Sequence, residues 1–175
     1  MSAVIVYESM FGNTRSVAEA LARGIGHHTK TTIVNVNDAG TRFPDADLVL
    51  VGGPTHIHGL SSPTTREEAE RWSHDPAKNV ALAQKVPGIG IREWLAGLAG
   101  TAGEFVAFDT RADAAAVLTG SAAKHIRKSL TKAGGHAFAD DESFTMRNNQ
   151  IDTAELVRAE RLGEGLGSRL ASDLT

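Results

Sequence analysis

The sequence predicts an α/β protein built on a doubly wound, five-stranded parallel sheet with helices on both faces. Short apolar runs rich in β-branched residues alternate with helical patterns five times along the 175 residues. Most of these runs are continuously apolar, which is typical of parallel strands buried on both faces, and such strands need crossover helices between them. No repeat, linker or low-complexity stretch interrupts the alternation, so we expect one domain over residues 1–175.

The expected strands cover residues 3–7, 31–36, 48–51, 104–108 and 136–139. The helical stripes between and after them cover residues 17–25, 91–98, 122–133 and 156–170. The second run alternates apolar and polar residues, as a strand at or near a sheet edge does. The third is followed at once by Gly52-Gly53-Pro54, where we expect it to end. The weak fifth strand could resume at 143–146, and we predict the strand order 2-1-3-4-5.

The stretch 60–87 is the least regular part of the chain. Ser62-Pro63 has the pattern of a helix N-cap followed by proline at the first helical position, and Asp75-Pro76 would break that helix. The charged residues 66–71 predict that the segment faces solvent. We therefore expect a partly helical, mobile insertion beside the ligand site rather than an insertion into the fifth strand.

Composition excludes several classes of function. The absence of cysteine rules out disulfides, thiolate metal sites, iron–sulfur ligation and cysteine nucleophiles. The net charge of −3, without any run of Lys or Arg, gives no reason to expect a nucleic-acid partner. No apolar stretch approaches the roughly 18 residues of a membrane span, and no secretory signal is evident at the N-terminus. We expect a cytoplasmic protein without a membrane span.

Three segments follow strands and should meet at the carboxyl edge of the sheet: residues 9–14, 52–60 and 109–113. In open doubly wound sheets this edge is where ligands bind. The first segment has the features of a phosphate-binding loop, because hydroxyls, an amide and a glycine lie between a buried strand and a helix start. The N–H groups and positive dipole end of that helix would face an anion.

From the residues alone, an ordinary strand-to-helix turn with polar caps is as good an interpretation of segment 9–14. Competing phosphate loops fit less well, because the segment has neither the lysine of a P-loop nor the G-x-G-x-x-G spacing of a dinucleotide fold. The order strand, Ser-x-Phe-Gly-Asn-Thr, helix resembles the FMN phosphate loop of the flavodoxin family, usually Ser/Thr-x-Thr-Gly-x-Thr. The resemblance extends over nearly the whole chain. It implies FMN as cofactor, with the phosphate held by Ser9, Met10, Phe11, Gly12, Asn13 and Thr14.

The resemblance also implies which residues surround the flavin ring. The first ring loop would supply Pro54, Thr55, His56, Ile57, His58 and Gly59, and the second Asp109, Thr110, Arg111 and Asp113. Histidine stands where flavodoxins often stack Trp or Tyr, and the second loop contains no aromatic residue, so we expect a ring site without aromatic walls. Arg111 near the ring would stabilise the anionic reduced flavin and make two-electron chemistry more accessible. His56-x-His58 has no further ligands near it in sequence, so we expect no metal site.

The resemblance implies a flavodoxin-type electron-transfer protein, whose partner would be a redox protein or a small-molecule electron acceptor. Against a dedicated carrier stands the mild charge, since such carriers are commonly strongly acidic. Two alternatives stay open. An FMN-dependent NAD(P)H:quinone-type oxidoreductase would build a substrate pocket from the histidines, Arg111 and the 60–87 insertion. A non-redox interaction domain would carry a decayed flavin site. No catalytic residue is singled out.

Overall fold

A computed structural model describes residues 1–56, 59–83, 88–100, 102–113 and 120–172. Its parallel core contains β1 (Ser2–Tyr7), β2 (Lys30–Asn35), β3 (Leu48–His56), β5 (Glu104–Ala112), β6 (His136–Ala137) and β7 (Glu142–Arg147). The strands are arranged β2-β1-β3-β5-β7, with β6 also paired to β5. This confirms the predicted parallel sheet, the order 2-1-3-4-5 and the edge position of the second strand.

The sheet has more strands than the five predicted. The fifth strand is divided into β6 and β7, which pair with opposite halves of β5. Two short strands add antiparallel pairings, β4 (Gly59–Leu60) against β3 and β8 (Gln150–Ile151) against β7. Asn148 and Asn149 form the two-residue turn between β7 and β8 with positive φ angles of 50° and 61°. Asparagine tolerates this backbone conformation, which two-residue hairpin turns require.

The central strands run further than their apolar runs predict. β3 continues through Gly52-Gly53-Pro54 to His56, and β5 continues to Ala112. Proline has no N–H to donate to a neighbouring strand. Pro54 is tolerated because β1 stops pairing with β3 at Gly52, so no hydrogen bond between these two strands is lost at Pro54. Gly52 is required for a different reason. A Cβ atom there would lie 2.1 Å from Cζ of Phe108 on the neighbouring strand.

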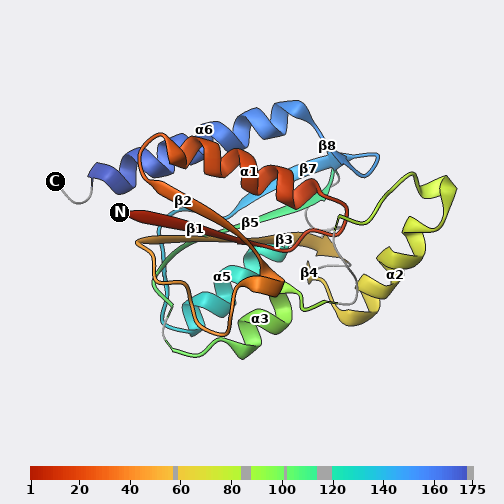
Figure 1. Cartoon of the computed structure of the whole chain (residues 1–175), viewed down its shortest axis with the longest axis horizontal. Coiled ribbons are helices and arrows are strands. Elements are labelled where there is room, and N and C mark those ends of the chain that lie inside the picture. The colour runs from red at the N-terminus through yellow and green to blue at the C-terminus, as the bar shows by residue number, and fades with distance from the viewer. Residues whose placement is uncertain (57–58, 84–87, 101, 114–119, 173–175) are drawn as a thin grey trace.

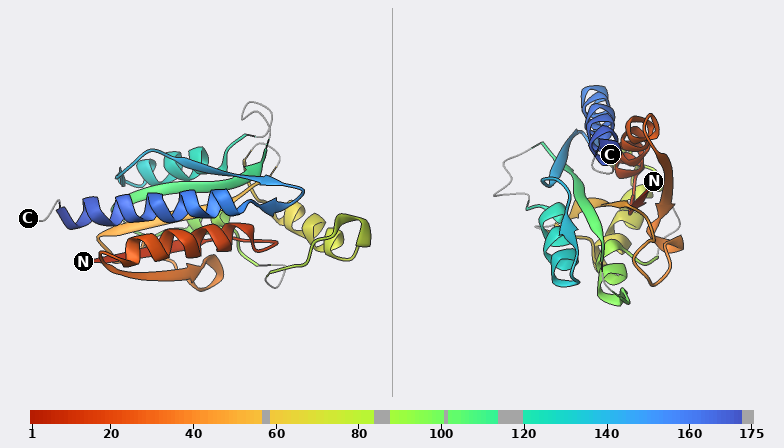
Figure 2. Two further views of the ribbon diagram at one scale, coloured as in Figure 1. Left: turned by 90° about the horizontal axis from the view of Figure 1, so that it is seen from above. Right: turned by 90° about the vertical axis from the view of Figure 1, so that its left-hand side faces the viewer.

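Two pairs of helices cover the two faces of the sheet (Figure 1). On one face lie α1 (Asn13–Gly26) and α6 (Thr153–Ser172), and on the other α3 (Ile91–Gly97) and α5 (Ala122–Lys132). The end-on view in Figure 2 shows the resulting three layers. Alternate residues of β1 separate into the two cores, with Ile5 under α1 and α6 and Val6 under α3 and α5. The sheet is therefore buried on both faces, as the continuous apolar runs predict.

The predicted insertion is partly helical and lies beyond the carboxyl ends of the strands (Figure 1). It contains α2 (Pro63–Ser73) and the short 3-10 helix η2 (Pro76–Lys78). Ser62 is the N-cap of α2, as its sequence predicts, and accepts a hydrogen bond from the Thr65 N–H at 3.3 Å. The expectation that the charged stretch 66–71 faces solvent is wrong for Arg66, which is only 3% exposed. The mobility of the insertion stays a prediction.

Candidate functional site

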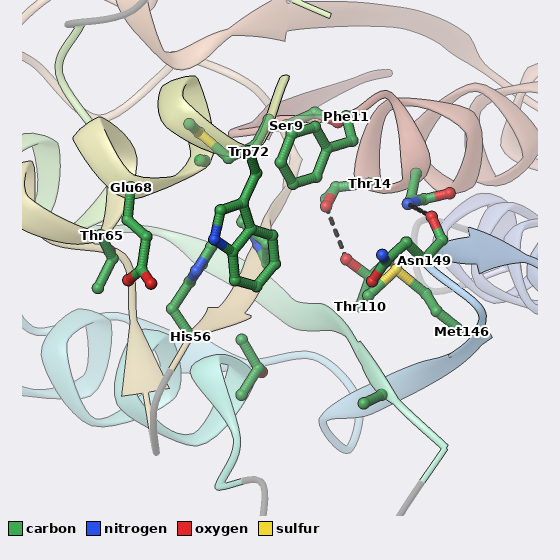
Figure 3. A pocket seen from close by; sticks show the side chains of 16 residues that line it. Ser9, Phe11, Thr14, His56, Thr65, Glu68, Trp72, Thr110, Met146 and Asn149 are labelled. Carbon is green, nitrogen blue, oxygen red and sulfur yellow. Dashed lines mark hydrogen bonds between the residues drawn. The ribbon is translucent and has the colours of Figure 1, made fainter. Parts of the chain in front are cut away.

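A pocket of about 320 Å³ lies at the carboxyl edge of the sheet, where the sequence predicts a ligand site (Figure 3). It unites predicted residues from all three segments. These residues are Ser9, Met10, Phe11, Asn13, Thr14, Pro54, Thr55, His56 and Thr110. The strand order explains the convergence, because β1, β3 and β5 are adjacent and parallel, so the segments that follow them meet at one edge.

The amino end of α1 opens into this pocket without a side-chain cap. Gly12 is the N-cap, in the left-handed conformation with φ of 90°, and the first turn of the helix contains no acidic residue. The Gly12 carbonyl accepts the Ser16 N–H at 2.9 Å and the Ser16 hydroxyl at 3.1 Å. The first-turn N–H groups therefore have no carboxylate or hydroxyl of a cap to bind them. Such a helix end favours an anion.

The hydroxyl groups beside this helix end differ in the bonds that they already make. Ser9 is 2% exposed, and its Oγ atom has no hydrogen-bond partner among the described residues. Thr14 and Thr110 are also buried and share a hydrogen bond of 2.8 Å between their Oγ1 atoms. Because a buried polar atom without a partner is unfavourable, Ser9 Oγ is the group in this pocket that most needs a ligand oxygen.

The Asn13 side chain, predicted to help hold phosphate, is engaged elsewhere. Its Nδ2 donates to the Asn149 carbonyl at 2.8 Å, and its Oδ1 accepts the Ile151 N–H at 3.0 Å. Asn13 thus ties the start of α1 to the β7–β8 hairpin. This contact brings Met146 and Asn149 into the pocket, two residues that the sequence analysis missed. The Asn148-Asn149 pair, a turn signal, could have revealed the hairpin.

The end of β3 forms the ring side of the predicted site. His56 lines the pocket, and burial lowers the pKa of its imidazole, with the positive charge of Arg66 acting in the same direction and Glu68 opposing both. A lowered pKa keeps the His56 imidazole neutral near pH 7. Thr55 also lines the pocket, but its Oγ1 accepts the Ala122 N–H of α5 at 2.9 Å. Ile57 and His58, two further predicted ring residues, lie outside the described residues.

The second predicted ring segment contributes less than expected. Because β5 extends to Ala112, successive side chains point to opposite faces, and only Thr110 and Ala112 line the pocket. Arg111, expected beside the ring, is therefore directed to the opposite face of the strand. Asp113 forms an ion pair with Arg147 at 2.8 Å.

Asp109 is buried in the sheet, and its carboxylate accepts hydrogen bonds from the amino end of α5. Its Oδ2 atom accepts hydrogen bonds from the Ser121 hydroxyl at 2.7 Å and from the Ala123 N–H at 2.9 Å. Gly59, the last residue of the first ring loop, packs against the His125 ring of the same helix rather than lining the pocket. These two predicted residues thus help to place α5 beside the ends of β3 and β5.

Helix α2, part of the insertion expected beside the ligand site, supplies a wall of the pocket with residues that the sequence analysis did not name. The residues on its inner face are Thr65, Glu68, Ala69 and Trp72, spaced three, four and seven positions from the first. Figure 3 shows the Trp72 side chain projecting from α2 into the pocket. Together with Phe11, it corrects the expectation of a site without aromatic walls. The i, i+3, i+4, i+7 spacing was readable from the sequence, but the direction of that face was not.

The segment around α2 is also joined to the phosphate-loop candidate. Ala69 packs against the buried Met10, and partly buried Phe11 and Leu82 pack against this pair. The Ala83 N–H donates to the Met10 carbonyl at 2.7 Å. The Trp72 indole is contacted by Lys78, whose Nζ lies 4.9 Å from the ring centroid. Met10 thus supports α2 through Ala69, and Lys78 contacts the aromatic ring itself.

A family model for flavodoxin matches residues 5–100, more than half of the chain and all of the first two loop segments. The chain belongs to the flavodoxin family. A comparison with the curated proteins gave no match. Among solved structures, the chain resembles flavodoxins at low sequence identity, so that these likenesses show the fold.

Three of these similar structures are typical. Oxidised flavodoxin 1 from Bacillus cereus matches with a TM-score of 0.67 and 13% identity, over 96% of this chain and 98% of that one. A flavodoxin from the domain Archaea matches with a TM-score of 0.61 and 17% identity, over 97% and 99%. A flavodoxin, WrbA-like protein from Agrobacterium tumefaciens matches with a TM-score of 0.58 and 17% identity, over 98% of both chains.

Two further features bear on the classes of function weighed from the sequence. Among the described helices, none is both long enough and apolar enough to cross a membrane. Within the described ranges, which leave out His58, no three histidine or carboxylate residues come together as metal ligands.

Proposed function

We propose that this chain binds FMN in the pocket at the carboxyl edge of the sheet and acts as an electron-transfer flavoprotein. The observation that carries the proposal is the buried, unpartnered Ser9 hydroxyl beside the uncapped amino end of α1. This combination of a neutral donor and a helix dipole suits a phosphate dianion. Membership of the flavodoxin family supports the same ligand.

The phosphate would be held by hydroxyl and N–H donors of Ser9, Thr14 and the backbone of residues 11–13. Among the residues that the structure describes, which leave out Lys85, no lysine or arginine lines the pocket. The charge of the phosphate would therefore be balanced by the helix terminus and hydrogen bonds rather than by an ion pair. Asn13 would act indirectly, since its side chain holds the hairpin that completes the wall.

The flavin ring would lie between the end of β3 and the aromatic wall from α2. Pro54 and His56 would border one side and Trp72 another, all of them lining residues of the same pocket. A neutral His56 places no positive charge beside the ring, and a flat indole excludes water from it. When bound, FMN supplies one- and two-electron redox chemistry, which the protein alone lacks.

The test is a titration of purified protein with FMN and, in parallel, with riboflavin, which has the ring but no phosphate. We expect FMN to bind more tightly than riboflavin and to change its visible absorption spectrum on binding. Equal affinity for the two would reject the phosphate role of the α1 terminus. Failure to bind either flavin would reject the proposal and favour a non-redox interaction domain.

A second candidate, an FMN-dependent oxidoreductase for small acceptors, is favoured by one observation. Helix α2 covers part of the pocket with Glu68 and Trp72, whereas a protein partner needs an exposed ring edge. Such an enzyme would oxidise a reduced nicotinamide and pass the two electrons to a quinone. Steady-state assays of the FMN-loaded protein with NADH or NADPH and a soluble quinone would distinguish it from a carrier, which should show no saturable turnover.

A further inference from the structure

A buried ion cluster lies between α2, the end of β1 and the start of α3. Its centre is Arg66, whose Nη1 donates to the Ser61 hydroxyl at 2.9 Å and whose Nη2 lies 3.1 Å from Glu93 Oε2. Ser61 in turn donates to Glu8, and Glu8 Oε2 accepts the Ile91 N–H at 2.8 Å. One arginine of the insertion is thereby joined to two segments of the main body.

The cluster is closely packed and, apart from the Glu93 side chain, closed to solvent. Arg66 is 3% exposed, and Glu8 and Ser61 are fully buried. A Cβ atom on Gly90 would lie 2.5 Å from Arg66 Nη1 and 2.8 Å from both Glu8 Oε2 and Ser61 Oγ. Residue 90 must therefore be glycine for these three groups to meet. A charge buried this completely is tolerated only with its partners in place.

The position of Arg66 on α2 determines what the rest of the helix presents. Thr65, Glu68 and Trp72 line the pocket, while Arg66 is directed into the cluster. Because the side chains of a helix are fixed relative to one another, holding Arg66 sets the rotation of α2 and hence the direction of Trp72. Apart from Arg66, the buried contact of α2 is Ala69 against Met10. One small apolar residue is a weak anchor by comparison.

We propose that Arg66 is a positioning residue of the pocket, which holds α2 and its aromatic wall against the ligand through Glu8, Ser61 and Glu93. The inference rests on the proposed function in so far as the ligand is a flavin. None of the four cluster side chains is among the lining residues of the pocket, so the cluster acts by orienting the wall. Loss of Arg66 should release α2, lower flavin affinity and leave the α1 phosphate site in place.

The experiment compares Arg66→Gln and Arg66→Lys with the wild-type protein. Flavin affinity is measured by titration, and the wall by quenching of Trp72 fluorescence, with Trp72→Phe giving the background from Trp94. We expect Arg66→Gln to bind FMN and riboflavin at least tenfold more weakly and to lose most of the Trp72 quenching. Arg66→Lys, which keeps the charge, should recover part of both.

Arg127→Gln is the control, because Arg127 lies on α5 and pairs with Asp141, just before β7, and neither residue lines the pocket. It should keep wild-type flavin affinity and quenching. Wild-type affinity and quenching in a folded Arg66→Gln protein would overturn the inference. If Arg66→Gln does not fold, Glu93→Gln removes the partner that is one-third exposed. Weaker flavin binding with loss of quenching would then support the inference, and wild-type values of both would overturn it.

Amide hydrogen exchange without flavin separates this inference from the proposed function. Faster exchange in α2 of the Arg66 variants, but not of Arg127→Gln, is expected whether or not flavin binds. Unchanged exchange in α2 would overturn the positioning role. A wild-type protein that binds no flavin would instead reject the proposed function.

Discussion

At the scale of single residues, the pocket combines one hydroxyl that has no hydrogen-bond partner among the described residues with several that are already bonded. Ser9 Oγ has no partner among the described residues, Thr14 shares its hydrogen bond with Thr110, and Thr55 is occupied by α5. Hydrogen-bond geometry therefore ranks these residues in a way that their sequence positions do not. Ser9 should matter most to an anion, and Thr14 next.

The first prediction concerns these hydroxyls. Ser9→Ala and Thr14→Ala each remove one hydrogen bond to a charged group, worth about 1.5–3 kcal/mol, so FMN affinity should fall roughly 10- to 150-fold for each. Riboflavin affinity should stay unchanged, because the ring contacts are intact. Ser16→Ala is the matched control, since this hydroxyl lies in the same helix turn but donates to the Gly12 carbonyl. Unchanged FMN affinity in a protein with both Ser9→Ala and Thr14→Ala would show that these hydroxyls do not hold the phosphate.

The second prediction concerns Trp72. FMN should quench its fluorescence, and Trp72→Ala should weaken both FMN and riboflavin by about 0.5–1.5 kcal/mol or more, roughly 2- to 13-fold. Loss of affinity for both flavins distinguishes a ring contact from a phosphate contact. Trp94 is buried in the core, where its indole N–H donates to the Gly40 carbonyl at 2.9 Å. A quenching signal that persists in Trp72→Ala would show that Trp94 is its source and contradict the assignment.

The third prediction concerns the pH dependence of stability. Burial raises the pKa of the Glu8 carboxyl above its ordinary 4.5, despite opposing hydrogen bonds from Ser61 and Ile91. A carboxyl with a raised pKa binds its proton more tightly when folded, so it destabilises the fold progressively as pH rises through that pKa. Glu8→Gln should remove this dependence, so its free energy of unfolding should increase relative to that of the wild type as the pH rises above 4.5.

Urea unfolding at several pH values measures this difference. Comparison with the wild type at each pH cancels the contribution of His56, whose lowered pKa acts with the opposite sign below 6.5. Glu104→Gln, at an exposed position of β5, is the control. Its free energy of unfolding should change with pH in the same way as that of the wild type. A Glu8→Gln curve that also runs parallel to the wild type would show that Glu8 does not titrate in this range.

At the scale of elements, helices α1 and α6 pack at the closest approach that backbones allow. A Cβ atom on Gly163 would lie 2.3 Å from the Leu21 carbonyl oxygen, and one on Gly24 would lie 2.0 Å from the Glu160 carbonyl oxygen. This contact matters for the site because α1 carries the phosphate-loop candidate at its amino end. A change in the separation of the two helices should therefore affect stability directly and ligand binding only through the position of α1.

The fourth prediction uses two glycines of α6 as a matched pair. Gly163→Ala forces the helices apart and should destabilise the protein by about 1–3 kcal/mol, the range for overpacking. Gly165→Ala meets nothing within 4 Å, so its higher helix propensity should stabilise by up to about 1 kcal/mol. Chemical denaturation measures both. Equal effects of the two substitutions would contradict the close packing of α1 and α6.

At the scale of the whole molecule, the pocket brings together elements from the beginning, middle and end of the chain. Its lining residues come from the first helix, the central strands, the insertion and the β7–β8 hairpin. A ligand there contacts segments that are distant in sequence and binds only when all of them are folded. Ligand binding should therefore stabilise the native state globally.

The fifth prediction follows from this linkage. Saturating FMN at about 100 times its Kd should add about 2.7 kcal/mol to the free energy of unfolding and raise the melting temperature measurably. Riboflavin at the same concentration should add less. Calorimetry with and without each flavin provides the measurement. A melting temperature independent of FMN concentration would contradict specific binding to the folded state.

Sequence patterns alone predict the parallel sheet, its strand order, the partly helical insertion and the place where three loops meet. Hydrophobic periodicity and strand–helix alternation are local signals, and right-handed crossovers leave few ways to arrange them. The loop Ser9–Thr14 was identifiable for the same reason, since its residues are contiguous. Prediction was less accurate at the strand ends. Gly52-Gly53-Pro54 was expected to stop β3, but the pairing partners present allow the strand to continue.

Which side chains face the pocket depends on long-range packing. Extension of β5 by four residues turned Arg111 away from the pocket and left Thr110 and Ala112 in it. The rotation of α2 placed Trp72 in the pocket and buried Arg66 against Glu8 and Glu93, partners far from it in sequence. A helix of this composition has the same local pattern in either orientation. Its direction depends on burying one charge among distant partners, a long-range energy that no local sequence signal contains.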